Sequence, residues 1–327
     1  MVVLYLLILI AGFAALVKGA DFFVDGSSAL ARIFRVPTLI IGLTIVALGT
    51  SAPEFAVSTI AAANGSNEIA MSNVVGSNLF NLLVVLGSCA ALKVIPVRGS
   101  TLKADYPVAT LPAAALLVLL GGSSLLSGEL IRTPMSATVG TVTRPVAAVL
   151  ILVYILYLFF LVRSALKNRE AEGESAGGRE STRKSVILLL IGFVLIVIGG
   201  EAVVESAKRL AAALGMTETL IGLTVVSLGT SLPELVTSIV ASRKGELELA
   251  VGTVMGSNIF NILVITGVSA VIRPMAVNAA CIWDLLILVI VTIMAWVFSF
   301  TGRRLNRAEG ALMCAAYIGV LVFAILR

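Results

Sequence analysis

Apolar runs of 18 or more residues recur along nearly the whole chain, and short polar connections separate them. About 20 apolar residues cross the hydrocarbon core of a bilayer as a helix, so this pattern predicts a polytopic membrane protein. The alternating segments of roughly ten residues that would indicate a membrane β-barrel are not found. The runs predict ten helices, at about residues 2–30, 36–62, 68–92, 104–122, 145–166, 184–213, 216–241, 247–272, 280–300 and 306–326.

The longest polar connection covers about residues 167–183 and is rich in Gly, Ser, Glu and Arg. This composition is typical of a flexible linker, and the segment is too short for a folded regulatory domain. We therefore expect five helices in residues 1–166, a linker at 167–183 and five helices in residues 184–327. The pattern predicts no structure for the Ser- and Thr-rich stretch at 123–144, which is longer than its counterpart near 301–305.

Positive charge is distributed unequally between the connections. The odd-numbered connections hold sixteen Lys and Arg residues, and the even-numbered ones hold five. Cytoplasmic loops of membrane proteins carry the excess of Lys and Arg. We therefore expect a multi-pass plasma-membrane protein with a cytoplasmic linker and both termini outside the cell. The first apolar run lacks a basic segment before it, so we interpret it as a membrane helix and not as a signal peptide.

Composition excludes several classes of function. The chain has no histidine, which removes zinc sites of the HExxH type and Ser-His catalytic pairs. Its three cysteines have unrelated spacings and predict neither a disulfide framework nor a metal cluster. The net charge of +5 is not gathered into a basic cluster interleaved with aromatic residues, so nucleic-acid binding is not expected.

The two halves of the chain repeat each other at an offset of 180 positions. Between Ile41–Gly87 and Ile221–Gly267, 25 of 47 residues are identical without a gap, which indicates an internal duplication. Because each half has an odd number of helices, the second half enters the membrane from the opposite side. The sequence thus predicts an all-α integral membrane protein of ten helices in two inverted five-helix repeats. Transporters built this way place their substrate site near the midplane of the bilayer.

Each repeat contains the string Gly-Thr-Ser-x-Pro-Glu, at 49–54 and at 229–234. A carboxylate in the middle of an apolar helix is a functional-site hypothesis, since its burial in hydrocarbon is unfavourable. The proline cannot donate a backbone hydrogen bond, so carbonyls near the preceding glycine lose their helical partners. Carbonyls, hydroxyls and carboxylates are hard oxygen ligands that suit Na⁺ and Ca²⁺. Small polar residues at three- and four-residue spacing place these groups on one helix face.

A second pair of strings, Gly-Ser-Asn-x-Phe-Asn, follows at 76–81 and 256–261. The serine and the final asparagine are four residues apart on one helix face, and the asparagine adds a neutral oxygen ligand. Acidic residues elsewhere have simpler interpretations. We expect Asp21, Asp25, Glu201 and Glu205 to have helix-end or interfacial roles, and the pair Asp105 and Asp284 to begin the fourth and ninth helices, where a helix N-terminus favours a carboxylate.

These paired motifs resemble the two α-repeats of the sodium/calcium exchanger superfamily, and the chain is similar to a prokaryotic member. The resemblance covers most of the chain and is specific, since both motifs occur twice in the correct order. It implies that Glu54 and Glu234 are the central cation ligands. It further implies that the first and sixth helices form a long gating pair. The remaining ligands that it implies are Ser51, Ser231, Thr50, Thr230, Asn81, Asn261, Ser77, Ser257, and the carbonyls of Ala47 and Ser227.

One departure from the family pattern bears on ion stoichiometry. Well-known members carry Asn in one repeat and Asp in the other at the last position of the second motif, whereas Asn81 and Asn261 are both amides. The site would then hold two formal negative charges, from Glu54 and Glu234. That charge balances one Ca²⁺ or two Na⁺, and a third Na⁺ would leave a charge unmatched in a low dielectric.

The sequence therefore predicts a secondary antiporter that exchanges Na⁺ for Ca²⁺ by alternating access. A Ca²⁺/H⁺ antiporter that uses the same glutamates is the nearest alternative, and an ion channel is a rival from another class. We do not expect an enzyme, because no nucleophile and base form a recognisable pair. We expect no cofactor, Ca²⁺ and Na⁺ as the transported ions, the lipid bilayer as the surroundings, and a monomer.

Overall fold

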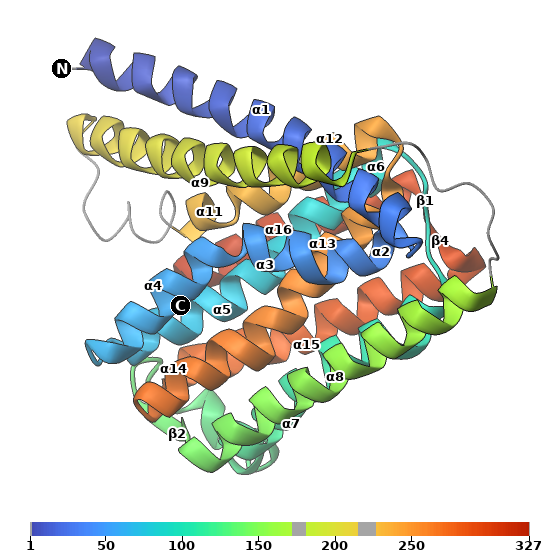
Figure 1. Ribbon diagram of the computed structural model, residues 1–327. Coiled ribbons are helices and arrows are strands. Elements are labelled where there is room, and N and C mark those ends of the chain that lie inside the picture. The colour runs from blue at the N-terminus through green and yellow to red at the C-terminus, as the bar shows by residue number, and fades with distance from the viewer. Residues whose placement is uncertain (1, 172–180, 215–226, 327) are drawn as a thin grey trace. The chain divides into compact units, whose positions relative to one another are not determined.

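The computed structural model describes residues 2–171, 181–214 and 227–326 of the chain. These residues are helical almost throughout, with a few short strands (Figure 1). They form two compact units, Met1–Pro53 with Leu161–Gly256 and Glu54–Phe160 with Ser257–Arg327. Each unit therefore contains segments from both halves of the sequence. The expected division into 1–166 and 184–327 follows the sequence repeat, whereas these units follow the packing.

Two long helices dominate the first unit. Helices α1 (Val2–Phe34) and α9 (Thr182–Ala213) lie side by side and antiparallel (Figure 1). A hydrophobic core of aliphatic residues and Phe23 joins them to shorter helices, with Leu16, Phe23 and Ile196 almost completely buried. The shorter elements are α2 (Thr38–Ile41), the π-helical segment η1 (Gly42–Val46), α3 (Ala47–Thr50), α11 (Ser227–Thr230), α12 (Leu232–Lys244) and the first part of α13 (Leu247–Phe260).

Glycines at a seven-residue spacing explain why α1 and α9 approach so closely. Gly12, Gly19 and Gly26 of α1 face Gly192, Gly199 and the backbone of α9. A Cβ built on Gly192 would lie 2.5 Å from a backbone nitrogen of α1. Small residues at a membrane helix interface allow such backbone contact. The sequence interpretation overlooked this pattern, although the spacing is visible in the sequence.

The second and seventh helices are broken, as the prolines predict. The run from α2 to α3 ends at Ser51, whose backbone leaves the helical region at φ −84° and ψ 9° before α4 (Ala52–Ala63) begins. The two arms of this broken helix are bent by 51°. Ser231 has nearly the same conformation, φ −92° and ψ 6°, between α11 and α12. Of the predicted helix at 216–241, residues 216–226 lie outside the described part of the chain.

In the described residues, the second unit contains most of α4, two equivalent three-part helices, and four long helices, of which α8 (Arg144–Ala171) continues into the first unit after Phe160. The first three-part helix is α5 (Asn67–Phe80), the π-helical segment η2 (Asn81–Leu86) and α6 (Gly87–Leu92). The second is the end of α13, the π-helical segment η6 (Asn261–Ile265) and α14 (Thr266–Ile272). The long helices are α7 (Tyr106–Leu126), preceded by the π-helical segment η3 (Thr101–Asp105), α8, α15 (Ala279–Phe300) and α16 (Arg307–Leu326).

Two small antiparallel sheets in the second unit connect the repeats. Strand β1 (Ile95–Pro96) pairs with β4 (Arg304–Leu305), which follows a 3-10 turn, η7 (Thr301–Arg303). Strand β2 (Thr138–Val142) pairs with β3 (Met275–Asn278). The stretch at 123–144 therefore has a structural role, since it forms a 3-10 turn, η4 (Glu129–Ile131), and then β2. The two sheets are equivalent. Strands β1 and β3 each follow a three-part helix, and their partners β4 and β2 each precede the last helix of the other half, α16 and α8.

The predicted helix positions agree with the structure to within a few residues at most ends. Eight described helical runs are long and apolar enough to cross a membrane, or nine if the bent pair at Ser51 counts as one span. Helix α8 extends to Ala171, beyond its predicted end at 166. The expectation that Asp105 and Asp284 begin helices is wrong. Asp105 ends the segment that starts at Thr101, and Asp284 lies in the second turn of α15.

Candidate functional site

One residue from each Pro-Glu motif takes part in a contact within the first unit. Ser51 of the first motif donates a hydrogen bond to Oε1 of Glu234 in the second, at 2.8 Å. Ser51, Ser231 and Glu234 are each fully buried, and Thr230 is nearly so. A carboxylate that accepts a hydrogen bond from a buried hydroxyl forms a charge-assisted hydrogen bond. Such a bond is stronger than one between two neutral groups. The structure thus brings together a predicted ligand from each repeat.

Carbonyls that precede the helix break at Ser51 accept hydrogen bonds from Thr50, a residue that the sequence interpretation assigned to cation binding. The Thr50 hydroxyl donates to the carbonyls of Val46 and Ala47, at 3.1 and 3.4 Å. The Thr50 hydroxyl proton is therefore directed to its own helix, while the hydroxyl oxygen keeps lone pairs for a further contact. Ala47 begins α3 and is buried. Ser227 begins α11, in the equivalent position of the second repeat.

Glu54 lies in the first turn of α4, in the second unit, and is fully buried. Asn73 of α5 donates to its backbone carbonyl at 3.3 Å and to the Ser58 hydroxyl at 2.9 Å. Asn73 therefore holds the beginning of α4 against α5 and fixes the turn that carries Glu54. The sequence interpretation did not include Asn73, because its equivalent in the second repeat is Thr253 and the duplication does not mark it.

The middle asparagines of the Gly-Ser-Asn motifs hold the two three-part helices together. Asn78 donates to the carbonyl of Asn258 at 3.1 Å, and Asn258 donates to the carbonyl of Asn78 at 3.2 Å. Asn261 donates to Oδ1 of Asn78 at 3.0 Å. This reciprocal arrangement was not predicted. The signal was present, since both amides are identical in the two repeats and lie in apolar surroundings.

The last asparagines of these motifs offer buried oxygen atoms. Asn81 and Asn261 are fully buried and begin the π-helical segments η2 and η6. Among the described residues, neither the oxygen nor the nitrogen of the Asn81 side chain has a hydrogen-bond partner, and the same holds for the Asn261 oxygen. Buried polar atoms are nearly always satisfied, so such an atom requires an explanation. Single π-helical turns often occur at functional sites, and a cation would satisfy both oxygens.

A cluster of aromatic side chains in the second unit includes the sequence neighbours of Glu54 and Asn261. Phe55, next to Glu54, stacks on Phe260, next to Asn261, with ring centroids 6.1 Å apart. Tyr154 of α8 meets Phe260 edge to face at 5.9 Å. This contact places the first turn of α4 close to the end of α13. Ser77 and Ser257, one turn before the asparagines, are also buried.

The predicted ligands thus fall into two sets according to the unit that holds them. In the described residues no group of three or more Asp, Glu, Cys and His side chains could hold a metal ion by itself. Cation binding would therefore need hydroxyl, carbonyl and amide oxygens in addition to carboxylates. The first unit contains Ala47, Thr50, Ser51, Ser227, Thr230, Ser231 and Glu234, and the second contains Glu54, Ser77, Asn81, Ser257 and Asn261.

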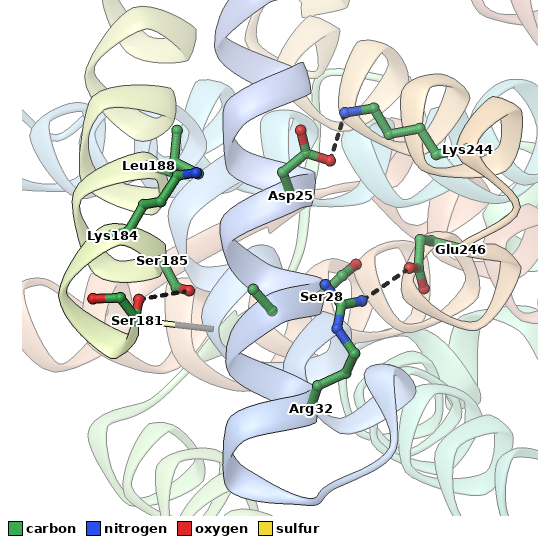
Figure 2. Close-up of a pocket in the computed structure, with 10 residues that line it drawn as sticks. Asp25, Ser28, Arg32, Ser181, Lys184, Ser185, Leu188, Lys244 and Glu246 are labelled. Atoms are coloured by element: carbon green, nitrogen blue, oxygen red, sulfur yellow. Dashed lines mark hydrogen bonds and ion pairs between the residues drawn. The ribbon is translucent and has the colours of Figure 1, made fainter. Parts of the chain in front are cut away.

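A charged pocket of about 700 Å³ lies elsewhere in the first unit, between α1, the start of α9 and the end of α12 (Figure 2). Lys244 contacts Asp25 at 2.7 Å and Asp21 at 3.2 Å, and Arg32 contacts Glu246 at 3.8 Å. Asp21 and Asp25 lie inside α1, which continues to Phe34, so they do not mark a helix end; their ion pairs with Lys244 of α12 are compatible with the other predicted role, an interfacial one.

Comparison with known proteins agrees with the resemblance of the motifs. A family model described as "Sodium/calcium exchanger protein" matches residues 4–163 and 184–326. The chain is 31% identical over 352 residues to the sodium/calcium exchanger MaX1 of Methanosarcina acetivorans, covering 98% of this chain and 99% of that protein. It is 35% identical over 276 residues to the inner membrane protein YrbG of Escherichia coli, covering 82% and 79%.

The fold is similar to that of a solved transporter. A structure of the sodium-calcium exchanger NCX_Mj, soaked with Na⁺ and Sr²⁺, superposes with a TM-score of 0.83 at 29% sequence identity. The match covers 98% of this chain and 99% of that chain. It therefore includes both units and both sets of motifs.

Proposed function

The chain belongs to the sodium/calcium exchanger family of membrane antiporters, and from this membership we propose that it exchanges Na⁺ for Ca²⁺ by alternating access. The observation that carries the proposal is the set of buried oxygens contributed by the duplicated motifs. Ser51 and Glu234 contact each other in the first unit. Asn81 and Asn261 hold buried oxygens that have no hydrogen-bond partner among the described residues.

We infer that the predicted ligands bind the transported ions. Glu54 and Glu234 supply the charge, and hydroxyl, amide and carbonyl oxygens complete the shell. Ca²⁺ accepts six to eight oxygens in a flexible geometry, whereas Mg²⁺ requires a tight octahedron and keeps its water. The full proposed set is Glu54, Glu234, Ser51, Ser231, Thr50, Thr230, Asn81, Asn261, Ser77, Ser257, Ala47 and Ser227.

Competition for the same oxygens gives the coupling between the two ions. With two carboxylates and two neutral amides, the proposed site carries a formal charge of −2, which one Ca²⁺ or two Na⁺ neutralise. We therefore propose that one Ca²⁺ exchanges for two Na⁺. We also propose that the ten helices form two inverted repeats, an arrangement common in transporters; each small sheet pairs one strand from each half of the sequence.

We further propose that the protein lies in the plasma membrane with both termini outside and the central linker in the cytoplasm. The support is the unequal distribution of Lys and Arg between the connections. We also propose that it acts as a monomer, because the duplication provides both halves of the site within one chain.

The proposed site is tested by neutralising each glutamate. Glu54→Gln and Glu234→Gln should each abolish Na⁺-gradient-driven ⁴⁵Ca²⁺ uptake into everted membrane vesicles, since a cation loses half of its balancing charge. Glu68→Gln is the matched control, because Glu68 is a repeat glutamate that is exposed. Full uptake in both single variants would refute the assignment. Uptake driven by a pH gradient, with Na⁺ absent, would instead favour Ca²⁺/H⁺ exchange.

A further inference from the structure

A buried carboxyl group lies outside the proposed cation site. Asp105 ends the π-helical segment η3 and is 2% exposed. It belongs to the run Thr101–Leu126, which is apolar and long enough to cross a membrane. An ionisable residue in such a position is rare and is a functional candidate by default.

The contacts of Asp105 satisfy one of its oxygens and leave the other without a partner. Tyr157 of α8 donates a hydrogen bond to Oδ1 at 2.8 Å. In the described part of the chain, Oδ2 is buried and has no hydrogen-bond partner. Thr101 lies one helical turn earlier, is fully buried, and its hydroxyl also lacks a hydrogen-bond partner there. Residues four apart in a helix lie on the same face.

No described basic residue forms an ion pair with Asp105. The titratable groups around it are phenols, Tyr157 and the adjacent Tyr106, with Tyr154 one turn from Tyr157. The Tyr106 hydroxyl is itself hydrogen-bonded to Ser299 of α15 at 2.7 Å, and its ring stacks on Trp296. Lys103 is nearby in sequence, but its side chain is exposed. A charge buried without a counter-charge is strongly unfavourable, so the group tends to be neutral instead.

We propose that Asp105 is a proton-binding site and is a neutral carboxylic acid in the folded protein. Its carbonyl oxygen, Oδ1, accepts from Tyr157, and its Oδ2–H donates to the hydroxyl oxygen of Thr101. One bound proton therefore satisfies both of the buried atoms that lack partners. A Na⁺ ion would need several more oxygens than Asp105, Thr101 and Tyr157 offer. The site is independent of Glu54 and Glu234, and it does not depend on which ions the protein exchanges.

A bound proton makes stability depend on pH with a defined sign. The folded chain holds a proton on Asp105 that the unfolded chain releases at neutral pH. Stability therefore falls as pH rises, because the folded state binds more protons than the unfolded state. In Asp105→Asn, the amide keeps one oxygen for Tyr157 and one N–H for Thr101 without a proton to lose.

The test is infrared spectroscopy of the full-length protein in lipid, with thermal unfolding over a range of pH. At neutral pH, wild type should show the carbonyl stretch of a protonated carboxylic acid, and Asp105→Asn should lack it. Tyr157→Phe should keep this band at a higher frequency, because the carbonyl loses a hydrogen bond. The melting temperature of wild type should fall towards alkaline pH, and this dependence should be weaker in Asp105→Asn.

Several results would overturn the proposal. One is a spectrum in which wild type and Asp105→Asn have the same carboxylic acid bands. Another is a Tyr157→Phe spectrum with an unshifted band, which remains informative if Asp105→Asn does not fold. A third is a melting temperature that rises with Na⁺ or K⁺ at constant pH in wild type but not in Asp105→Asn. That result would assign the carboxylate to a monovalent cation.

Discussion

Replacing Gly192 by alanine tests whether α1 and α9 need their close approach. The added Cβ would lie 2.5 Å from the backbone nitrogen of Phe23 and 2.7 Å from the carbonyl oxygen of Gly19. Ordinary contacts begin near 3.4 Å, so the helices must separate by about 1 Å at this level. Backbone atoms cannot rotate away as the end of a side chain can. The strain therefore spreads along the interface.

The size of the effect follows from two opposing contributions. Overpacking of this kind lowers the free energy of unfolding by about 1–3 kcal/mol. Where the helices separate by about 0.5–1 Å, each affected atom pair loses roughly a quarter to a half of its dispersion energy. Alanine also favours the helix over glycine by up to about 1 kcal/mol. We expect a net destabilisation of about 1–2 kcal/mol in Gly192→Ala. It should appear as a lower midpoint of thermal unfolding in detergent.

A matched control separates packing from helix propensity. Gly319 lies in α16, and a Cβ built there has no heavy atom within 4 Å. Gly319→Ala should therefore be as stable as wild type or slightly more stable. If Gly192→Ala unfolds at the same temperature as Gly319→Ala, the backbone contact between α1 and α9 does not limit stability, and the role assigned to the glycine spacing is wrong.

Two further predictions concern the motifs. In a double-mutant cycle, Asn78→Ala and Asn258→Ala should couple by about 0.5–2 kcal/mol in unfolding free energy, as contacting residues do. Asn78→Ala should lower the free energy of unfolding more than Asn258→Ala does, because it also removes the oxygen that accepts from Asn261. Additive effects of the two substitutions would show that the reciprocal hydrogen bonds do not act together. The proposed charge of −2 predicts electroneutral exchange, so clamping the potential of proteoliposomes with K⁺ and valinomycin should not change the initial rate of Ca²⁺ uptake. Asn261→Asp should make the rate depend on potential, and potential-dependent uptake by wild type would refute the two-for-one stoichiometry.

Long-period patterns in the sequence predicted the helices well, and local polar geometry was harder to predict. Hydropathy placed the long helices, and the proline of each Pro-Glu motif predicted the breaks that the structure shows at Ser51 and Ser231. The duplication marked the asparagines but could not show that Asn78 and Asn258 bond to each other. That contact depends on the packing of distant segments.

Buried acids show the limit of local interpretation most clearly. At Asp105, the neighbouring sequence resembled a helix start, where a carboxylate needs no special explanation. The structure extends the helix by one π-helical turn and covers the carboxyl with Tyr157. The strand β2 was unpredictable for a similar reason, since its partner β3 lies more than 130 positions away in sequence.

The interleaving of the repeats leads to a final prediction about the linker. Contacts such as Ser51 with Glu234, Asn78 with Asn258, and β1 with β4 each join one half of the sequence to the other. Neither half therefore has a complete core of its own. Cutting the chain between Gly177 and Gly178 should leave two fragments that copurify and transport Ca²⁺ when they are expressed together. Each fragment expressed alone should be degraded, since the faces that it buries against the other half would be exposed. If either fragment alone accumulates as a stable membrane protein, the halves are independent domains and the cross-repeat contacts are dispensable for folding.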